Sequence, residues 1–196
     1  MTAVILSDCS TMQAAEFTLL KCVCDGISIS HEIEWVNVQD LSVQPCKRCS
    51  KCLPHGECAL PEDDGQRVGR MIFSADALVI GLSTSLEKLS VKLANLLERI
   101  KGFLAFQNRQ GEFCAWRKGR SVVIISHEVP DKTAGKHLDK NTSVRSSLLQ
   151  VLCKGGFKLV GLLSAHPDVI PSLDSLPVEQ ARYFGKVLSG CAEKIK

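Results

Sequence analysis

Four of the ten cysteines lie within thirteen residues, and their spacing is C-x2-C-x2-C-x5-C. They are Cys46, Cys49, Cys52 and Cys58. A polynuclear metal centre needs several thiolates that converge on one point, and a short segment that turns on itself supplies three of them at every third position. The fourth thiolate returns after a bend, for which Pro54 and Gly56 are suitable residues.

Two kinds of metal site use four thiolates. Fe–S clusters take four cysteine ligands, and runs of this kind are among the more specific sequence signals. Structural zinc sites also use four cysteines, but usually draw them from two well-separated pairs. The chain has no second cysteine set for another cluster, so all four thiolates are available to one [4Fe–4S] cluster. The spacing favours that cluster, with zinc as the rival; a disulfide pair would require an oxidising compartment.

Basic residues lie between these cysteines. Lys47, Arg48 and Lys51 either offset the negative charge of a thiolate-ligated cluster or attract an acidic electron-transfer partner. The alternative is a basic loop that is simply solvated.

The composition is that of an ordinary globular chain. At 196 residues the sequence predicts a single domain, 1–196, with the cysteine loop at 45–62. The net charge of +3 is small and spread out, which gives no case for nucleic-acid binding. The first residues read as a strand rather than a signal peptide. No apolar run approaches the roughly 20 residues of a membrane span.

The many cysteines indicate a reducing, cytoplasmic location, because no secretion signal accompanies them. We interpret most of the remaining ones as small core residues. They are Cys9, Cys22, Cys24, Cys114, Cys153 and Cys191.

Five apolar or alternating segments predict strands and five periodic segments predict helices. The strands are Ala3–Leu6, Ile33–Val38, Ala77–Leu82, Ser121–Ser126 and Phe157–Leu163. The helices are Met12–Cys24, a segment capped by Asp63 and Asp64 and running to Phe73, Leu89–Ile100, Ser143–Cys153 and Pro177–Ile195. This alternation predicts an α/β fold, a flavodoxin-like doubly wound parallel sheet of five strands in the order 2-1-3-4-5.

In such a sheet the ligand crevice lies beyond the carboxyl ends of the strands, near the switch between strands 1 and 3. The loops Ser7–Gln13, Gly81–Leu89 and His127–Gly135 should meet there. The cysteine loop follows strand 2 and therefore lies on the same rim.

The chain resembles the iron–sulfur flavoprotein branch of the NADPH-dependent FMN reductase family over nearly its whole length. The family typically has a proline before the first cysteine, a glycine two residues before the fourth and an Asp pair soon after. Here these are Pro45, Gly56 and Asp63-Asp64. The segments Ala75–Gly81 and Val91–Arg99 resemble the family's third strand and following helix.

The resemblance implies FMN in the crevice, a nearby [4Fe–4S] cluster, a homodimer or higher homo-oligomer, and electron transfer from NAD(P)H or ferredoxin to a small acceptor such as oxygen, peroxide or a quinone. No catalytic side chain need be invoked. The implied flavin contacts lie in two loops. They are Ser7, Ser10, Thr11, Met12, Gln13, Ser83, Thr84, Ser85 and Leu86.

The flavin loops depart from the family pattern. The first lacks its glycine, proline and arginine, and Asp8 brings negative charge towards a phosphate. The second lacks the proline and the aromatic residue, and His127-Glu-Val-Pro130 replaces a glycine-rich third loop. His127 is either a flavin contact or a solvated loop residue. Two other functions therefore stay open: a flavin-free binding, assembly or sensor module with a structural zinc or Fe–S site, and a plain reductase with a vestigial metal loop.

Overall fold

A computed structural model of the chain describes residues 1–8, 14–27, 31–54, 56–82, 89–127, 142–165, 171–172 and 175–190. Within these ranges, no helix combines the length and apolar character needed to cross a bilayer.

The central sheet is parallel, with the strand order β2-β1-β3-β6-β7. Its strands are β1 (Thr2–Ser7), β2 (Glu32–Asn37), β3 (Ala77–Gly81), β6 (Arg120–His127) and β7 (Phe157–Ala165). Numbered along the chain without the hairpin described below, this is the order 2-1-3-4-5, so the predicted fold is confirmed.

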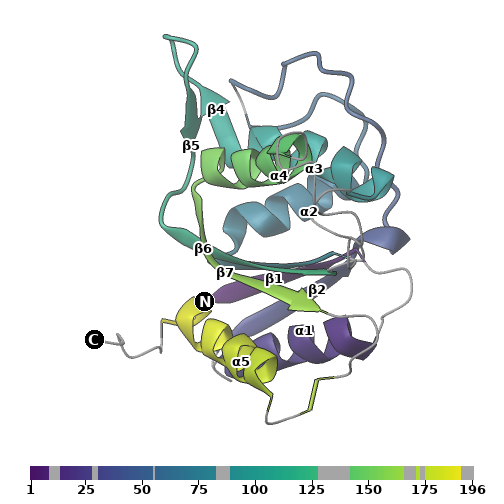
Figure 1. Cartoon of the computed structure of the whole chain (residues 1–196). Coiled ribbons are helices and arrows are strands. Elements are labelled where there is room, and N and C mark those ends of the chain that lie inside the picture. The colour runs from purple at the N-terminus through teal and green to yellow at the C-terminus, as the bar shows by residue number, and fades with distance from the viewer. Residues whose placement is uncertain are drawn as a thin grey trace.

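Helices cover both faces of the sheet, as Figure 1 shows. On one face lie α1 (Ala14–Gly26) and α5 (Leu176–Leu188). On the other lie α2 (Asp64–Ser74), α3 (Val91–Leu104) and α4 (Thr142–Lys154). This two-sided cover explains why the central strands are apolar at every position rather than at alternate ones.

The core divides into two clusters, one on each side of the sheet. Val4 and Leu6 of β1 belong to the cluster under α2, α3 and α4, whereas Ala3 and Ile5 belong to the cluster under α1 and α5. Successive strand residues point to opposite faces, so a single strand supplies both clusters.

The register places the carboxyl ends of three strands side by side. Ser7 at the end of β1 is paired with Asn37 of β2 and with Gly81 of β3. The chain leaves β2 through the short 3-10 helix η1 (Val38–Asp40) and enters the cysteine loop. The segment that leads into the cysteine loop therefore starts beside the end of β1.

Two features differ from the prediction. A hairpin of β4 (Ala105–Gln107) and β5 (Phe113–Ala115) follows α3 and has no counterpart among the predicted strands. The last helix ends at Leu188 rather than Ile195, because Gly190 adopts a left-handed φ of 70°.

The scattered cysteines are only partly core residues. Cys22 is buried and Cys24 and Cys114 are half-buried, but Cys153 is exposed, so the core interpretation is wrong for it. Cys9 and Cys191 lie outside the described residues.

Candidate functional site

The cysteine loop turns sharply in each interval between its cysteines. Arg48 has a φ of 51° between Cys46 and Cys49, and Ser50 has a φ of 57° in the next interval. Gly56, with a φ of 83°, lies in the last interval. Left-handed residues reverse the local direction of the chain, so one in each interval turns the four thiols back towards one another.

Backbone hydrogen bonds stabilise these turns. Leu53 N–H donates to Ser50 O at 3.1 Å, and Gly56 N–H donates to Cys52 O at 2.8 Å. The N–H of Arg48 donates to the sulfur of Cys46 at 3.4 Å. Bonds from backbone amides to sulfur stabilise a thiolate, and they also tune clusters that thiolates bind.

The Cys52 thiol interacts electrostatically with the other three thiols of the loop. Burial raises the pKa of the Cys52 thiol, and the neighbouring thiols of Cys58, Cys46 and Cys49 raise that pKa further. All four are free thiols. No three His, Cys, Asp or Glu side chains among the described residues lie close enough together to hold one metal ion. The four cysteine thiols and the backbone turns between them fit a thiolate-ligated metal. In the described structure, however, the sulfurs do not converge closely enough to coordinate one ion.

The tip of the loop rests on α3 and on the β4–β5 hairpin. Cys52 packs against Gly102 of α3, where a Cβ atom would lie 2.7 Å from Cys52 Cβ. The indole of Trp116, next to β5, donates to Gly102 O at 3.0 Å and lies beside Gly56. Gln107 N–H of β4 donates to Leu53 O at 3.4 Å. The unpredicted hairpin therefore supports the loop directly.

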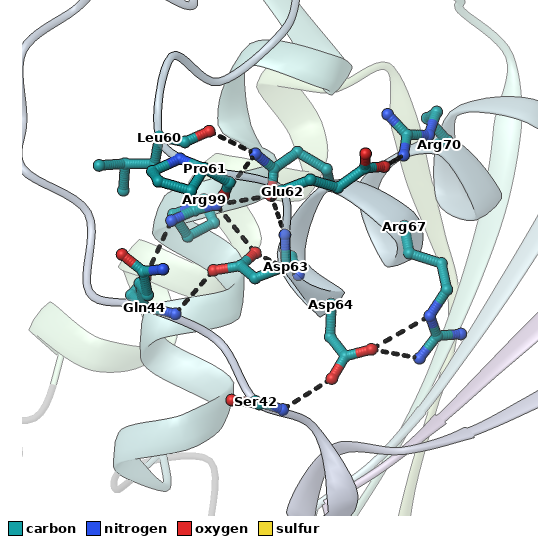
Figure 2. Close-up of polar contacts among 12 residues, drawn as sticks. Ser42, Gln44, Leu60, Pro61, Glu62, Asp63, Asp64, Arg67, Arg70 and Arg99 are labelled. Atoms are coloured by element: carbon teal, nitrogen blue, oxygen red, sulfur yellow. Dashed lines mark hydrogen bonds and ion pairs between the residues drawn. The ribbon is translucent and has the colours of Figure 1, made fainter.

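The base of the loop is attached to the start of α2 (Figure 2). Asp63 caps α2, and its other carboxylate oxygen accepts from Gln44 N–H at 2.9 Å. Asp64 accepts from Ser42 N–H at 2.8 Å and pairs with Arg67. The predicted role of the two aspartates as a helix cap is confirmed for Asp63, and both also hold the incoming chain.

Asp8 follows β1 at the edge where the crevice is predicted. Its side chain is fully buried, and its Oδ1 accepts from Gln39 Nε2 at 2.8 Å and from the Ser90 hydroxyl at 2.6 Å. Burial raises the pKa of Asp8, although the bonds from Ser90 and Gln39 lower it in part. Its Oδ2 and the hydroxyl of Ser7 are buried and have no hydrogen-bond partner among the described residues.

The other predicted flavin contacts cannot be placed. These residues lie outside the described ranges: Ser10, Thr11, Met12, Gln13, Ser83, Thr84, Ser85 and Leu86. Of His127 the structure describes the backbone, at the end of β6, and not the side chain. For Ser7 the position at the carboxyl end of β1 agrees with the crevice expected of this fold.

Several residues around the loop were not predicted as part of the site. They are Gln107, Trp116, Gly102 and Gln66, together with Arg99 in its contact with the loop. In the sequence, Glu98 and Arg99 indicate only the end of a helix. One signal of a contact surface is Gly102, three residues after Arg99: residues i and i+3 share one face of a helix, and a glycine there leaves room for another segment to pack.

No established protein-family profile matches this chain. The chain is 32% identical over 82 residues to a curated protein described as an iron–sulfur flavoprotein, from Archaeoglobus fulgidus. The matched segment covers 41% of this chain and only 40% of that relative. The resemblance to iron–sulfur flavoproteins is thus supported over part of the chain.

Solved structures match over almost the whole length. An FMN-dependent NADH-azoreductase from Bacillus anthracis, solved with FMN, has a TM-score of 0.63 at 18% identity, over 98% of this chain and 99% of its own. An NAD(P)H:quinone oxidoreductase from Methanothermobacter marburgensis has a TM-score of 0.64 at 18% identity, over 96% and 98%. The chain has a flavodoxin-like fold. In a sheet of this order the ligand crevice lies beyond the carboxyl ends of the strands, where Asp8 contacts Ser90 at the start of α3, whereas Cys52 packs against Gly102 near the other end of that helix.

Proposed function

We propose that the protein is an oxidoreductase or electron carrier that uses FMN and a [4Fe–4S] cluster. The observation that carries the proposal is the grouping of four free thiols in one loop, with a left-handed residue in each interval between them. The partial match to an iron–sulfur flavoprotein supports the same cofactors. A flavin exchanges hydride or single electrons and a cluster exchanges single electrons, so together they connect two-electron and one-electron carriers.

The residues that would hold the cluster are Cys46, Cys49, Cys52 and Cys58. A left-handed residue in each interval reverses the chain between these cysteines, and the N–H of Arg48 donates to the Cys46 sulfur, which supports the assignment. Half-burial of Cys52 against α3 excludes water from one side of the group. Exposed Lys47, Arg48 and Lys51 place positive charge around the loop, which offsets the charge of thiolates and favours an acidic donor such as ferredoxin.

The residues that would hold FMN are those of the first two loops, including Ser7. Within the part of the chain that the structure describes, two buried polar atoms at the end of β1, Ser7 Oγ and Asp8 Oδ2, lack hydrogen-bond partners, as expected where a polar ligand completes the hydrogen bonding. The Oδ1 of Asp8 already accepts from Gln39 and Ser90, so these two donors offset part of the negative charge that this side chain presents to a phosphate.

The remaining features of the proposal follow from this chemistry. NAD(P)H or ferredoxin donates electrons and a small molecule accepts them; a nicotinamide donor is supported by the names of two structural neighbours, an NADH-azoreductase and an NAD(P)H:quinone oxidoreductase. The proposed unit is one domain over residues 1–196 that acts as a homo-oligomer. The free state of the described cysteines agrees with a reducing cytoplasm.

Anaerobic purification followed by reductive titration tests the proposal. The expected result is a yellow-brown protein with a broad shoulder in the visible blue, bleached by NAD(P)H or reduced ferredoxin. Cys49→Ser should remove the shoulder, while Cys153→Ser, an exposed thiol outside the loop, should leave it intact. A colourless protein contradicts the proposal. Retained iron and activity in Cys49→Ser favour instead a plain reductase with a vestigial metal loop.

A second candidate is a flavin-free binding, assembly or sensor module whose loop holds zinc or a cluster. The observation that favours it is the buried carboxyl of Asp8 at the end of β1, where the flavin phosphate is expected. Added FMN distinguishes the two functions, since a ligand that binds only the folded chain raises the melting temperature. An unchanged melting temperature with saturating FMN supports the module.

A further inference from the structure

Arg99 is a buried cation at the base of the cysteine loop. It lies on α3, is 1% exposed, and its guanidinium lies beside Gln44 and Asp63, as Figure 2 shows. Its Nη2 donates to Asp63 Oδ1 at 2.9 Å and to Gln66 Oε1 at 2.7 Å. Its Nη1 donates to Gln44 O at 3.2 Å. The guanidinium thus connects α3 to two segments that are far from it in the sequence, one at Gln44 and one at Asp63 and Gln66.

These contacts fix the chain on both sides of the loop. We call residues 42–45 the first stem and residues 59–62 the second stem. Gln44 of the first stem accepts from Arg99 through its carbonyl and donates its N–H to Asp63. In the second stem the carbonyls of Leu60 and Pro61 accept from Gln66 Nε2 at 2.9 and 3.1 Å. Asp63 and Gln66 therefore connect Arg99 to both stems.

Each stem is directly adjacent in sequence to one of the outer two cysteines, Cys46 and Cys58. Gln44 precedes Cys46 by two residues, and Leu60 follows Cys58 by two residues. Fixing the two stems to one guanidinium therefore limits how far the first and last thiols can separate. A third point of attachment, besides the two stems, is Gly102. It lies on the same face of α3 as Arg99, and Cys52 packs against it.

The chemistry of the guanidinium suits this role better than a role in core stability. Arg99 Nε is buried and has no hydrogen-bond partner in the described ranges, which is unfavourable for the folded chain. Apolar side chains often replace buried ion pairs without loss of stability. A planar fork that reaches three acceptors in different directions is specific to arginine, because lysine offers a single charged point.

We infer that Arg99 is a positioning residue that holds the two stems of the cysteine loop at a fixed separation and so preorganises the four thiols for metal. The holding of the stems stands on the hydrogen bonds alone; the benefit to metal binding rests on the proposed function. Loss of the fork frees the stems, so the loop samples open conformations and releases metal faster.

Trypsin cleavage of the metal-free chain under reducing conditions tests the first half. Exposed Lys47, Arg48 and Lys51 supply cleavage sites inside the loop. Arg99→Met should speed cleavage at these sites by about tenfold or more, since cleavage follows local opening. Arg99→Lys keeps the charge and loses the planar fork, so its rate of cleavage in the loop should lie between those of Arg99→Met and the parent. If Arg99→Met does not fold, Arg99→Lys alone provides the test.

The matched control is Arg120→Met. Arg120 is also buried, but its guanidinium donates to carbonyls of α2 and of Gly155 rather than to the loop stems. Its loss should lower the melting temperature without faster cleavage in the loop. Equal loop cleavage in the parent and both Arg99 variants, or equal acceleration in Arg120→Met, overturns the inference.

Metal release tests the second half. Metal-loaded parent and Arg99→Lys are mixed with excess chelator, and the loss of metal is followed over time. The expected result is a release rate at least about tenfold higher in Arg99→Lys. A parent that binds neither iron nor zinc contradicts the proposed function while the cleavage result still decides the role of Arg99. A metal-binding parent with equal release rates overturns the preorganisation of the thiols.

Discussion

Cys52 lies directly on the backbone of Gly102. A Cβ atom at residue 102 would lie 2.7 Å from Cys52 Cβ, 3.0 Å from its sulfur and 3.2 Å from its carbonyl oxygen. The surrounding helix α3 is buried along this face, so the loop rather than the helix must move if residue 102 gains a side chain. The contact makes the position of one thiol sensitive to a single methyl group.

Gly102→Ala should therefore reduce the iron bound per chain by at least about half. Alanine favours a helix by about 1 kcal/mol relative to glycine, so a loss of iron cannot be attributed to a weaker helix. Iron analysis and thermal melting on the same anaerobic preparation provide the measurement. Lys101→Ala, one residue away on the same helix, is the control and should retain its iron. Full iron content in Gly102→Ala contradicts a role for this contact.

Asp8→Asn should change how stability depends on pH. Burial raises the pKa of Asp8 above its ordinary value of 3.8, so the folded chain binds this proton more tightly than the unfolded chain. The stability from this group is fully present below pH 3.8 and is lost as the pH rises through the folded-state pKa. Asparagine cannot ionise, so the free energy of unfolding of Asp8→Asn relative to the parent should increase between about pH 4 and about pH 7.

Urea denaturation of both chains at several pH values measures that difference. A difference that stays constant over this range shows that Asp8 ionises in the folded chain as readily as in water. The comparison uses the parent at each pH, which cancels the contributions of the other carboxyl groups.

Ser90→Ala should destabilise the chain by about 1–2 kcal/mol. The Ser90 hydroxyl accepts from Leu93 N–H at 3.1 Å as the cap of α3 and donates to Asp8 Oδ1 at 2.6 Å. Both bonds are lost in the variant. Combining it with Asp8→Asn tests the coupling, because two residues in contact should give a non-additive sum in the free energy of unfolding. Additive effects would show that the two side chains act independently.

The cysteines outside the loop should differ in their rates of alkylation. Burial, together with the neighbouring charge of Asp25, raises the pKa of Cys24 to about 11, so little thiolate forms at neutral pH. Cys153 is exposed. Iodoacetamide followed by peptide mass spectrometry should modify Cys153 at least about tenfold faster than Cys24. Comparable rates contradict the burial of Cys24.

Local patterns predicted the sheet well because each strand is apolar enough to be recognised by itself. The continuous run at Val122–Ile125 and the capping residue Asp63 are examples of information carried by a few adjacent residues. The β4–β5 hairpin was missed because its strands have three residues each, too few to show alternation. Its stability comes from contacts such as that between Phe106 and Trp116, whose rings are tilted by 38° with their centroids 4.4 Å apart.

Of the candidate site, the sequence predicts the cysteine ligands but not the residues that hold their loop in place. The spacing of the cysteines identifies the thiols, but nothing near them in the sequence specifies what holds the loop. The contact of Arg99 with Gln44 spans 55 positions and that with Asp63 spans 36, and such pairs leave no periodic signal in one sequence. The end of α5 was misplaced for a simpler reason, since Gly190 was not recognised as a helix terminator.

The most direct test of the proposed function is to quantify iron, acid-labile sulfide and FMN in one anaerobically purified sample. The account predicts about four irons and about four sulfides per chain, bound by the four thiolates of the loop. It also predicts about one FMN per chain, bound at the crevice beyond β1 and β3. About one zinc per chain with no iron, sulfide or flavin would contradict it.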